Sequence, residues 1–177
     1  MNTIWRNLFI SAALAAVTMA AALAPAAAAP KQIGVYKAWK AYSSQESGGK
    51  VCFVVATPKS QSPKNVKRGD IFFIVTNWGG GHWQPSIEIG YPFKAGSTAS
   101  VNIGSNKFSL FTDNDDNSGN GGAWLREKAD ETRIVRAMKG GSSMIVKGTS
   151  KRGTLTTDRY SLSGITAALA AAAKSCK

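Results

Sequence analysis

Short runs of β-branched and aromatic residues, separated by segments rich in glycine, proline and polar residues, occupy most of the chain between residues 35 and 160. Runs of this length and composition are typical of β-strands. Many short strands joined by turns favour an antiparallel sheet. We therefore predict a mainly β fold: a single-domain antiparallel β-sandwich or barrel-like structure. The expected strands are residues 35–42, 51–57, 71–76, 86–89, 97–103, 107–111, 144–147 and 154–160.

Two segments have a helical pattern. In residues 130–139 the apolar side chains share one helical face, acids occupy the first turn, and two glycines follow the last turn. Ser163 is suited to cap a second helix further along the chain. The sequence thus predicts a short internal helix and a C-terminal helix docked on the sheet. The face expected to dock consists of Ile165, Ala168, Leu169, Ala172 and Cys176.

The first 28 residues have the composition of a secretory signal peptide. Arg6 precedes an uncharged apolar run from Leu8 to Leu23, and small residues follow it. We expect cleavage near residues 26–29, which leaves residues 29–177 as one domain. An uncleaved anchor is the less favoured alternative, because the run is rich in alanine and shorter than the roughly 20 residues of a spanning helix. The prediction is an exported protein, periplasmic, outer-envelope-associated or secreted, with no transmembrane span after cleavage.

Export determines how the two cysteines are interpreted. In an oxidising compartment Cys52 and Cys176 are expected to form a disulfide, and two cysteines allow only one pairing. A redox-active pair would more often have the close C-x-x-C spacing, which these residues lack. Because the bridge closes a long loop, the chain-entropy model gives it a stabilisation of roughly 4–5 kcal/mol.

The chain is strongly basic, with 22 Lys and Arg against 10 Asp and Glu and a formal net charge of +12. Outside the cytoplasm this charge favours an anionic partner, such as anionic lipid, lipopolysaccharide, or a host-surface glycan or protein, and not nucleic acid. A scattered basic surface that only aids solubility is the alternative, and both remain open. The candidate binding residues are Lys59, Lys64, Lys67, Arg68, Arg133, Arg136, Lys151 and Arg152.

His82 is the single histidine, and it lies between three glycines and Trp83. Together with an acid such as Asp70 or Glu88 it could serve a hydrolase of envelope polymers. We favour an exposed histidine at a hairpin tip, because the neighbouring sequence offers no second catalytic partner. No catalytic residue is therefore assigned.

Residues 113–117 cluster carboxylate and amide side chains, which are ligands for hard cations. An EF-hand-type loop that began at Asp113 would need glycine and glutamate at the places where Ser118 and Trp124 stand. A flexible acidic loop is favoured, and a weak cation site stays open. One histidine and two cysteines also argue against clustered metal ligands, so we expect no metal and no cofactor.

Several short motifs follow one another along the chain: GYPFKAGS at 90–97, FSLFT at 108–112, AW at 123–124, VKGTS at 146–150, RG at 152–153 and TDRYSLSG at 157–164, followed by Cys176. The order of these motifs resembles that of the invasion-associated locus B family of bacterial exported proteins. The resemblance extends over about residues 35–176, and it implies a β-rich periplasmic or envelope-associated domain. In some pathogens that family is linked to entry into host cells. The resemblance supplies no established catalytic residues.

Taken together, these features predict a non-enzymatic envelope protein that binds an anionic envelope or host-surface component through a basic face. It would contribute to host-cell interaction or invasion. A periplasmic hydrolase that uses His82 is one alternative. A periplasmic assembly partner or chaperone, which would pair through exposed sheet edges, is another.

Overall fold

The computed structural model describes residues 29–114 and 119–177 of the chain. The expected signal peptide lies outside these residues, as does most of the acidic segment 113–117. Within the described part, no helix has both the length and the hydropathy needed to cross a membrane.

The strands of the described part form one continuous antiparallel sheet. Its spatial order is β1-β2-β3-β5-β6-β9-β8-β7-β10-β11-β4, so the sheet is open and β1 and β4 are its edges. The prediction of a mainly β, antiparallel, single-domain fold is confirmed. The strands are β1 (Lys31–Tyr36), β2 (Trp39–Glu46), β3 (Gly49–Ala56), β4 (Ser60–Ser62), β5 (Phe72–Asn77), β6 (Gln84–Glu88), β7 (Thr98–Ile103), β8 (Asn106–Asp113), β9 (Gly122–Trp124), β10 (Ser143–Thr149) and β11 (Leu155–Ser161).

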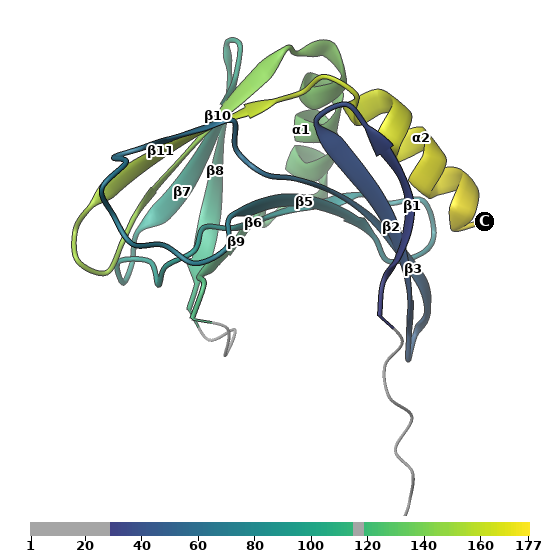
Figure 1. Cartoon of the computed structure of the whole chain (residues 1–177), viewed down its shortest axis with the longest axis horizontal. Helices are drawn as coiled ribbons and strands as arrows, with labels where there is room; N and C mark the ends of the chain where they lie inside the picture. The colour runs from purple at the N-terminus through teal and green to yellow at the C-terminus, as the bar shows by residue number, and fades with distance from the viewer. Residues whose placement is uncertain (1–28, 115–118) are drawn as a thin grey trace, which may run out of the picture.

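The sheet is strongly bent, so that strands far apart in its order share one core. Figure 1 shows β1–β3 at one side, β7, β8, β10 and β11 at the other, and β5, β6 and β9 between them. The ring of Phe73 on β5 packs edge-on against both Trp39 of β2 and Tyr160 of β11. The indole N–H of Trp39 donates a hydrogen bond to the Ser161 carbonyl oxygen at 3.0 Å. A single sheet thereby encloses its core without closing into a barrel.

The structure differs from the sequence prediction at the first strand. Residues 35–42 form two strands, because the chain turns at Lys37 and Ala38. Tyr36 and Trp39 are directly paired, which makes a two-residue hairpin. Lys37 has a φ of 55°, in a region that glycine or asparagine usually occupies. Since no such turn residue marks the position, the alternating pattern of these residues looks like that of one strand.

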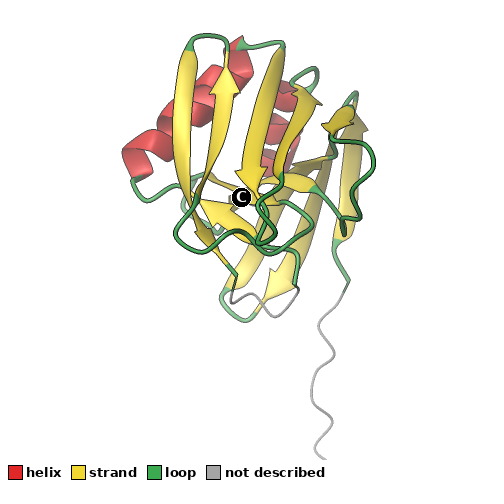
Figure 2. Cartoon of the chain, turned by 90° about the vertical axis from the view of Figure 1, so that its left-hand side faces the viewer, coloured by secondary structure: helices red, strands yellow, loops and turns green. Residues whose placement is uncertain are grey.

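Two helices complete the fold of the described residues. The first, α1 (Lys128–Gly140), extends slightly beyond the predicted residues 130–139, and α2 (Ile165–Ser175) agrees with the predicted C-terminal helix. Helix α2 packs on β1, β2 and β3, and α1 contacts β6, β8 and α2. In Figure 2 both helices lie behind the strands that face the viewer. The prediction that Ser163 caps α2 is wrong: the residue before the helix is Gly164, and no side chain caps it.

The predicted disulfide is present. Cys52 of β3 is bonded to Cys176, which directly follows α2. Cys52 is completely buried. The bridge therefore attaches the end of the C-terminal helix to the sheet on which the helix packs.

Candidate functional site

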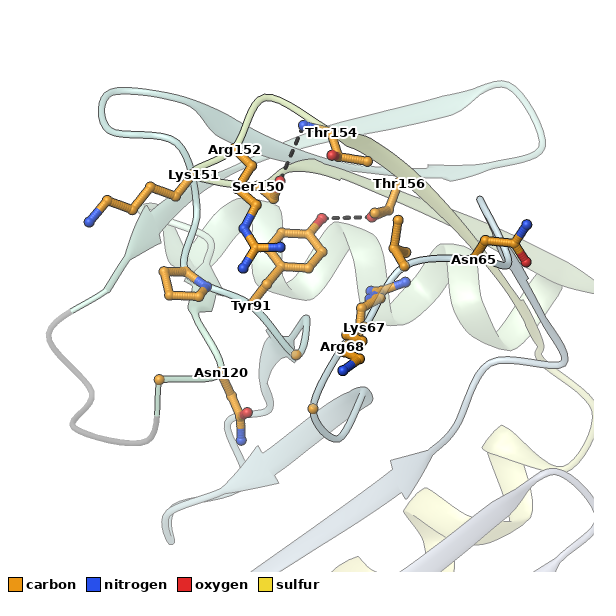
Figure 3. Close-up of a pocket in the computed structure, with 15 residues that line it drawn as sticks. Asn65, Lys67, Arg68, Tyr91, Asn120, Ser150, Lys151, Arg152, Thr154 and Thr156 are labelled. Atoms are coloured by element: carbon orange, nitrogen blue, oxygen red, sulfur yellow. Dashed lines mark hydrogen bonds between the residues drawn. The ribbon is translucent and has the colours of Figure 1, made fainter.

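A cavity of about 700 Å³ opens where four connecting segments meet. The segments are residues 65–69 before β5, 90–92 after β6, 119–120 before β9, and 150–154 between β10 and β11. Figure 3 shows Lys67 and Arg68 on one side of this cavity and Lys151 and Arg152 on the other, with Tyr91 between them. The bend of the sheet thus brings together the two basic segments that the sequence places far apart. We call this cavity the basic pocket.

Backbone hydrogen bonds fix the segments that surround the basic pocket. The amide of Gly69 donates to the Gly90 carbonyl oxygen at 2.8 Å, and the amide of Tyr91 donates to the Asn120 carbonyl oxygen at 2.9 Å. Gly90 has a φ of 77°, and a Cβ atom there would lie 2.7 Å from the Gly69 carbonyl oxygen. This close approach requires glycine. The amide of Lys151 also donates to the Pro92 carbonyl oxygen at 2.8 Å.

Arg68 forms part of the wall of the basic pocket, and its side chain is almost fully buried. Its two terminal nitrogens each lie 2.7 Å from a carboxylate oxygen of Asp158, in a bidentate ion pair. Nε and a second N–H of Nη2 donate to the Ile89 carbonyl oxygen, at 3.0 and 2.7 Å. The side chains of Arg68 and Asp158 are 4% and 0% exposed. The guanidinium is thus engaged within the protein, and its geometry is that of a structural tie between β11 and the β4–β5 connection.

Tyr91 lies against this ion pair. The Arg68 guanidinium is 5.1 Å from the centre of the Tyr91 ring, and the phenol oxygen is 2.6 Å from the hydroxyl oxygen of Thr156. Burial raises the pKa of the Tyr91 phenol, and the hydrogen bond with Thr156 and the charge of Arg68 oppose this rise. The phenol is therefore neutral at physiological pH.

The cations at the rim of the basic pocket are exposed to solvent, unlike the side chain of Arg68. Lys67, Lys151 and Arg152 line the cavity and are exposed. No Asp or Glu lines the cavity among the described residues. Since Asp158 balances the charge of Arg68, the charge that faces the cavity comes from these three side chains. Such an arrangement attracts anions.

The other predicted basic residues lie elsewhere. Lys59 directly precedes β4, and Lys64 lies with Lys67 in the β4–β5 connection; both Lys59 and Lys64 are exposed and do not line the basic pocket. Arg133 lies on α1, where it stacks over Phe108 at 5.0 Å and pairs with Asp130 at 3.1 Å. Arg136, also on α1, lines a second cavity of about 290 Å³ together with His82 and Lys139. The eight candidates therefore do not line one common cavity.

His82 has a partner that the sequence analysis did not identify. Its Nε2 contacts a carboxylate oxygen of Glu131 on α1, and not Asp70 or Glu88, the acids closer to it in sequence. The His82 side chain is 38% exposed and that of Glu131 is 6% exposed. Among the described residues, Thr132 is the one hydroxyl residue that lines this second cavity, and it donates to the Lys128 carbonyl oxygen at 3.1 Å. No serine or cysteine lines the cavity in the described part, so the pair has no adjacent nucleophile of the usual kind.

The described residues contain no group of three or more His, Cys, Asp or Glu side chains placed to hold a metal ion. Residues 115–117 of the expected cation segment lie outside the described residues. Asp113 and Asn114 are described, and the Asn114 side chain hydrogen-bonds the backbone of Phe93 at 2.6 and 3.0 Å.

Fold and site together define a disulfide-linked, mainly β domain with a cation-rimmed pocket. The family model described as "Invasion associated locus B (IalB) protein" matches residues 39–173, and the chain belongs to this family. Among solved structures, the crystal structure of invasion associated protein b from Bartonella henselae is similar in fold, with a TM-score of 0.59 at 11% sequence identity. That match covers 80% of this chain and 95% of the other. No curated protein matches significantly.

Proposed function

We propose that this protein is an exported, non-enzymatic envelope protein that binds an anionic component of the cell envelope or of a host surface through the basic pocket. The observation that carries the proposal is the convergence of Lys67, Lys151 and Arg152 on a cavity whose described lining contains no acid. Concentrated charge of one sign at a concave surface attracts ions of the other sign and orients their approach.

The fixed backbone around the basic pocket supports this proposal. Because hydrogen bonds already hold the four segments together, little ordering remains to be done when a ligand binds. The similar Bartonella protein is described as invasion associated. A contribution to host-cell interaction is carried over to this chain on that basis.

The proposed export rests on the signal-peptide pattern of residues 1–28. N-terminal sequencing of the protein from a periplasmic or culture fraction tests it. The expected result is a mature chain that starts near residues 27–30. A protein recovered from that fraction with its first 28 residues intact would contradict cleavage.

Binding to lipopolysaccharide and to phosphatidylglycerol vesicles, measured in a salt titration, tests the proposed function. We expect affinity to fall as salt rises, because salt screens exposed charges. The variant Lys67→Glu/Lys151→Glu/Arg152→Glu should bind at least about tenfold more weakly, since attraction at the rim becomes repulsion.

A charge-matched control is available in Lys40→Glu, Lys107→Glu and Lys174→Glu combined. These lysines are exposed and do not line the basic pocket. Lys107 of β8 lies opposite Asn102 of β7, and Asn102 lies opposite Ile145 near the start of β10. The basic pocket lies beyond the other end of β10. We expect the control variant to retain most of the affinity. Salt-insensitive binding, or equal losses in both variants, would contradict the proposal.

A further inference from the structure

The chemical class of the ligand can be narrowed from the lining of the basic pocket, on the premise that the proposed function holds. Its volume of about 700 Å³ lies within the usual range for small-molecule sites, about 300–1,000 Å³. A bare inorganic anion would leave most of this space unfilled. A compact organic anion fits it better.

Neutral hydrogen-bonding groups line the basic pocket alongside the cations. Ser150 and Thr156 already take part in hydrogen bonds: the Ser150 hydroxyl accepts from the Thr154 amide at 3.2 Å, and the Thr156 hydroxyl pairs with Tyr91 (Figure 3). A hydroxyl retains further donor or acceptor capacity after one bond. The side chains of Asn65 and Thr154 make no hydrogen bond within the described residues. These groups suit a ligand with several hydroxyls.

The aromatic component of the lining argues against a nucleotide. Tyr91 is only 8% exposed, and the Arg68 guanidinium lies over its ring at 5.1 Å. A base would need an accessible aromatic face on which to stack. The ring and the neighbouring Pro92 instead supply a limited apolar wall.

We infer that the basic pocket binds an acidic sugar, with the carboxylate or phosphate group at the rim formed by Lys67, Lys151 and Arg152. The sugar hydroxyls bind the amide of Asn65 and the hydroxyl of Thr154. Such sugars occur in two sources. Phosphorylated saccharides come from bacterial envelope polymers, and carboxylated saccharides come from surface glycans.

Isothermal titration calorimetry of the purified, disulfide-bonded protein with four probes tests the inference. The probes are glucose 6-phosphate, glucuronic acid, glucose and inorganic phosphate. We expect at least one acidic sugar to bind about tenfold more tightly than both glucose and inorganic phosphate. Preference for glucose 6-phosphate points to an envelope saccharide, and preference for glucuronic acid to a glycan.

Variants of the neutral groups separate sugar recognition from simple charge attraction. Thr154→Val removes the hydroxyl and keeps the shape, and Asn65→Ala removes the amide. Each should weaken binding of the acidic sugar by roughly threefold to tenfold, the usual effect of one hydrogen bond. Neither should change the binding of inorganic phosphate by more than about twofold, because that ion needs only the cations. Thr154→Ser, which keeps the hydroxyl, should retain most of the affinity.

The outcomes distinguish this inference from the proposed function on which it rests. If acidic sugars bind no more tightly than inorganic phosphate, while charge reversal at the rim still removes anion binding, the sugar inference is overturned and the proposed function stands. If no probe binds, and charge reversal also leaves binding to lipopolysaccharide and vesicles unchanged, the proposed function itself is wrong.

Discussion

Arg68 and Asp158 show how strongly one pair of residues can affect the fold and the basic pocket together. Both side chains are removed from water, so the charge of each depends on the other for compensation. The pair also connects β11 to the segment that carries Lys67.

Asp158→Asn should lower the free energy of unfolding by about 3–5 kcal/mol, because it leaves the Arg68 charge buried without its partner. Urea denaturation measures the change. Asp130→Asn is a suitable control, since Asp130 and Arg133 form an exposed pair, and we expect it to cost less than about 1 kcal/mol. Equal costs for the two variants would show that the buried pair is not important for stability.

Tyr160 is another buried polar side chain that affects stability. Its side chain is buried, and its hydroxyl has no hydrogen-bond partner among the described residues. Burial, and to a lesser extent the nearby Asp158 charge, raise the pKa of this phenol far above its usual value. Tyr160→Phe removes the unpaired hydroxyl and should stabilise the protein by about 1 kcal/mol.

The raised pKa of Tyr160 also predicts a pH dependence. A phenol with a pKa that is higher in the folded than in the unfolded protein contributes stability below about pH 10, and this contribution is lost as pH rises further. Urea midpoints measured from pH 8 upward should therefore fall above about pH 10. The decline should be shallower in Tyr160→Phe, and an identical decline would contradict this origin.

At the level of single elements, the start of α2 depends on Gly164. Its φ is 96°, and a Cβ atom there would overlap the carbonyl oxygen of Tyr36 in the first hairpin. Gly164→Ala should lower the free energy of unfolding by about 1–3 kcal/mol, through backbone strain and this overlap.

Variants of two other glycines, measured in the same urea experiment, separate the effect of backbone strain from the effect of the overlap with Tyr36. Gly153 also has a positive φ but open space around it, so Gly153→Ala should show the strain alone. Gly48 has neither feature, and Gly48→Ala should be nearly neutral. If Gly164→Ala costs no more than Gly153→Ala, the overlap with Tyr36 does not matter.

The elements that the sequence predicted well are those with a strong pattern of their own. The β-branched residues of β3 and β5 and the apolar face of α1 mark those elements clearly. In contrast, β4 and β9 have three residues each and form because they pair with neighbouring strands. Strand β9 fits between β6 and β8, a position that no local pattern reveals. The turn at Lys37 was missed for a related reason, since its positive φ accompanies the pairing of Tyr36 with Trp39 and is not indicated by the residue type.

For the whole molecule, the disulfide joins elements that are 124 residues apart in sequence. The variant Cys52→Ala/Cys176→Ala should lose about 4–5 kcal/mol of the free energy of unfolding, mainly because its unfolded chain is less restricted. Urea denaturation with and without a reductant measures this. Reductant should destabilise the native protein and leave the double variant unaffected. No effect of reductant on the native protein would contradict the prediction.

The basic pocket is also a property of the whole molecule, and this explains how far sequence analysis could go. Clusters of charge identified Lys67 and Lys151 as candidates, but only the bend of the sheet places them around one cavity. Arg68 was grouped with them, because its burial and its ion pair with Asp158 depend on the fold and cannot be recognised in the sequence. The contact between His82 and Glu131 likewise joins a loop to a helix that follows much later in the chain.

The bend of the sheet has one further consequence. Segments on both sides of the basic pocket come from strands that separate when the domain unfolds, so the unfolded chain has no equivalent site. By thermodynamic linkage, any compound that fills the pocket must raise the melting temperature, with a gain of about 2.7 kcal/mol at a hundredfold excess over its dissociation constant. A thermal-shift screen of compound libraries would therefore detect ligands of any chemical class by the same readout.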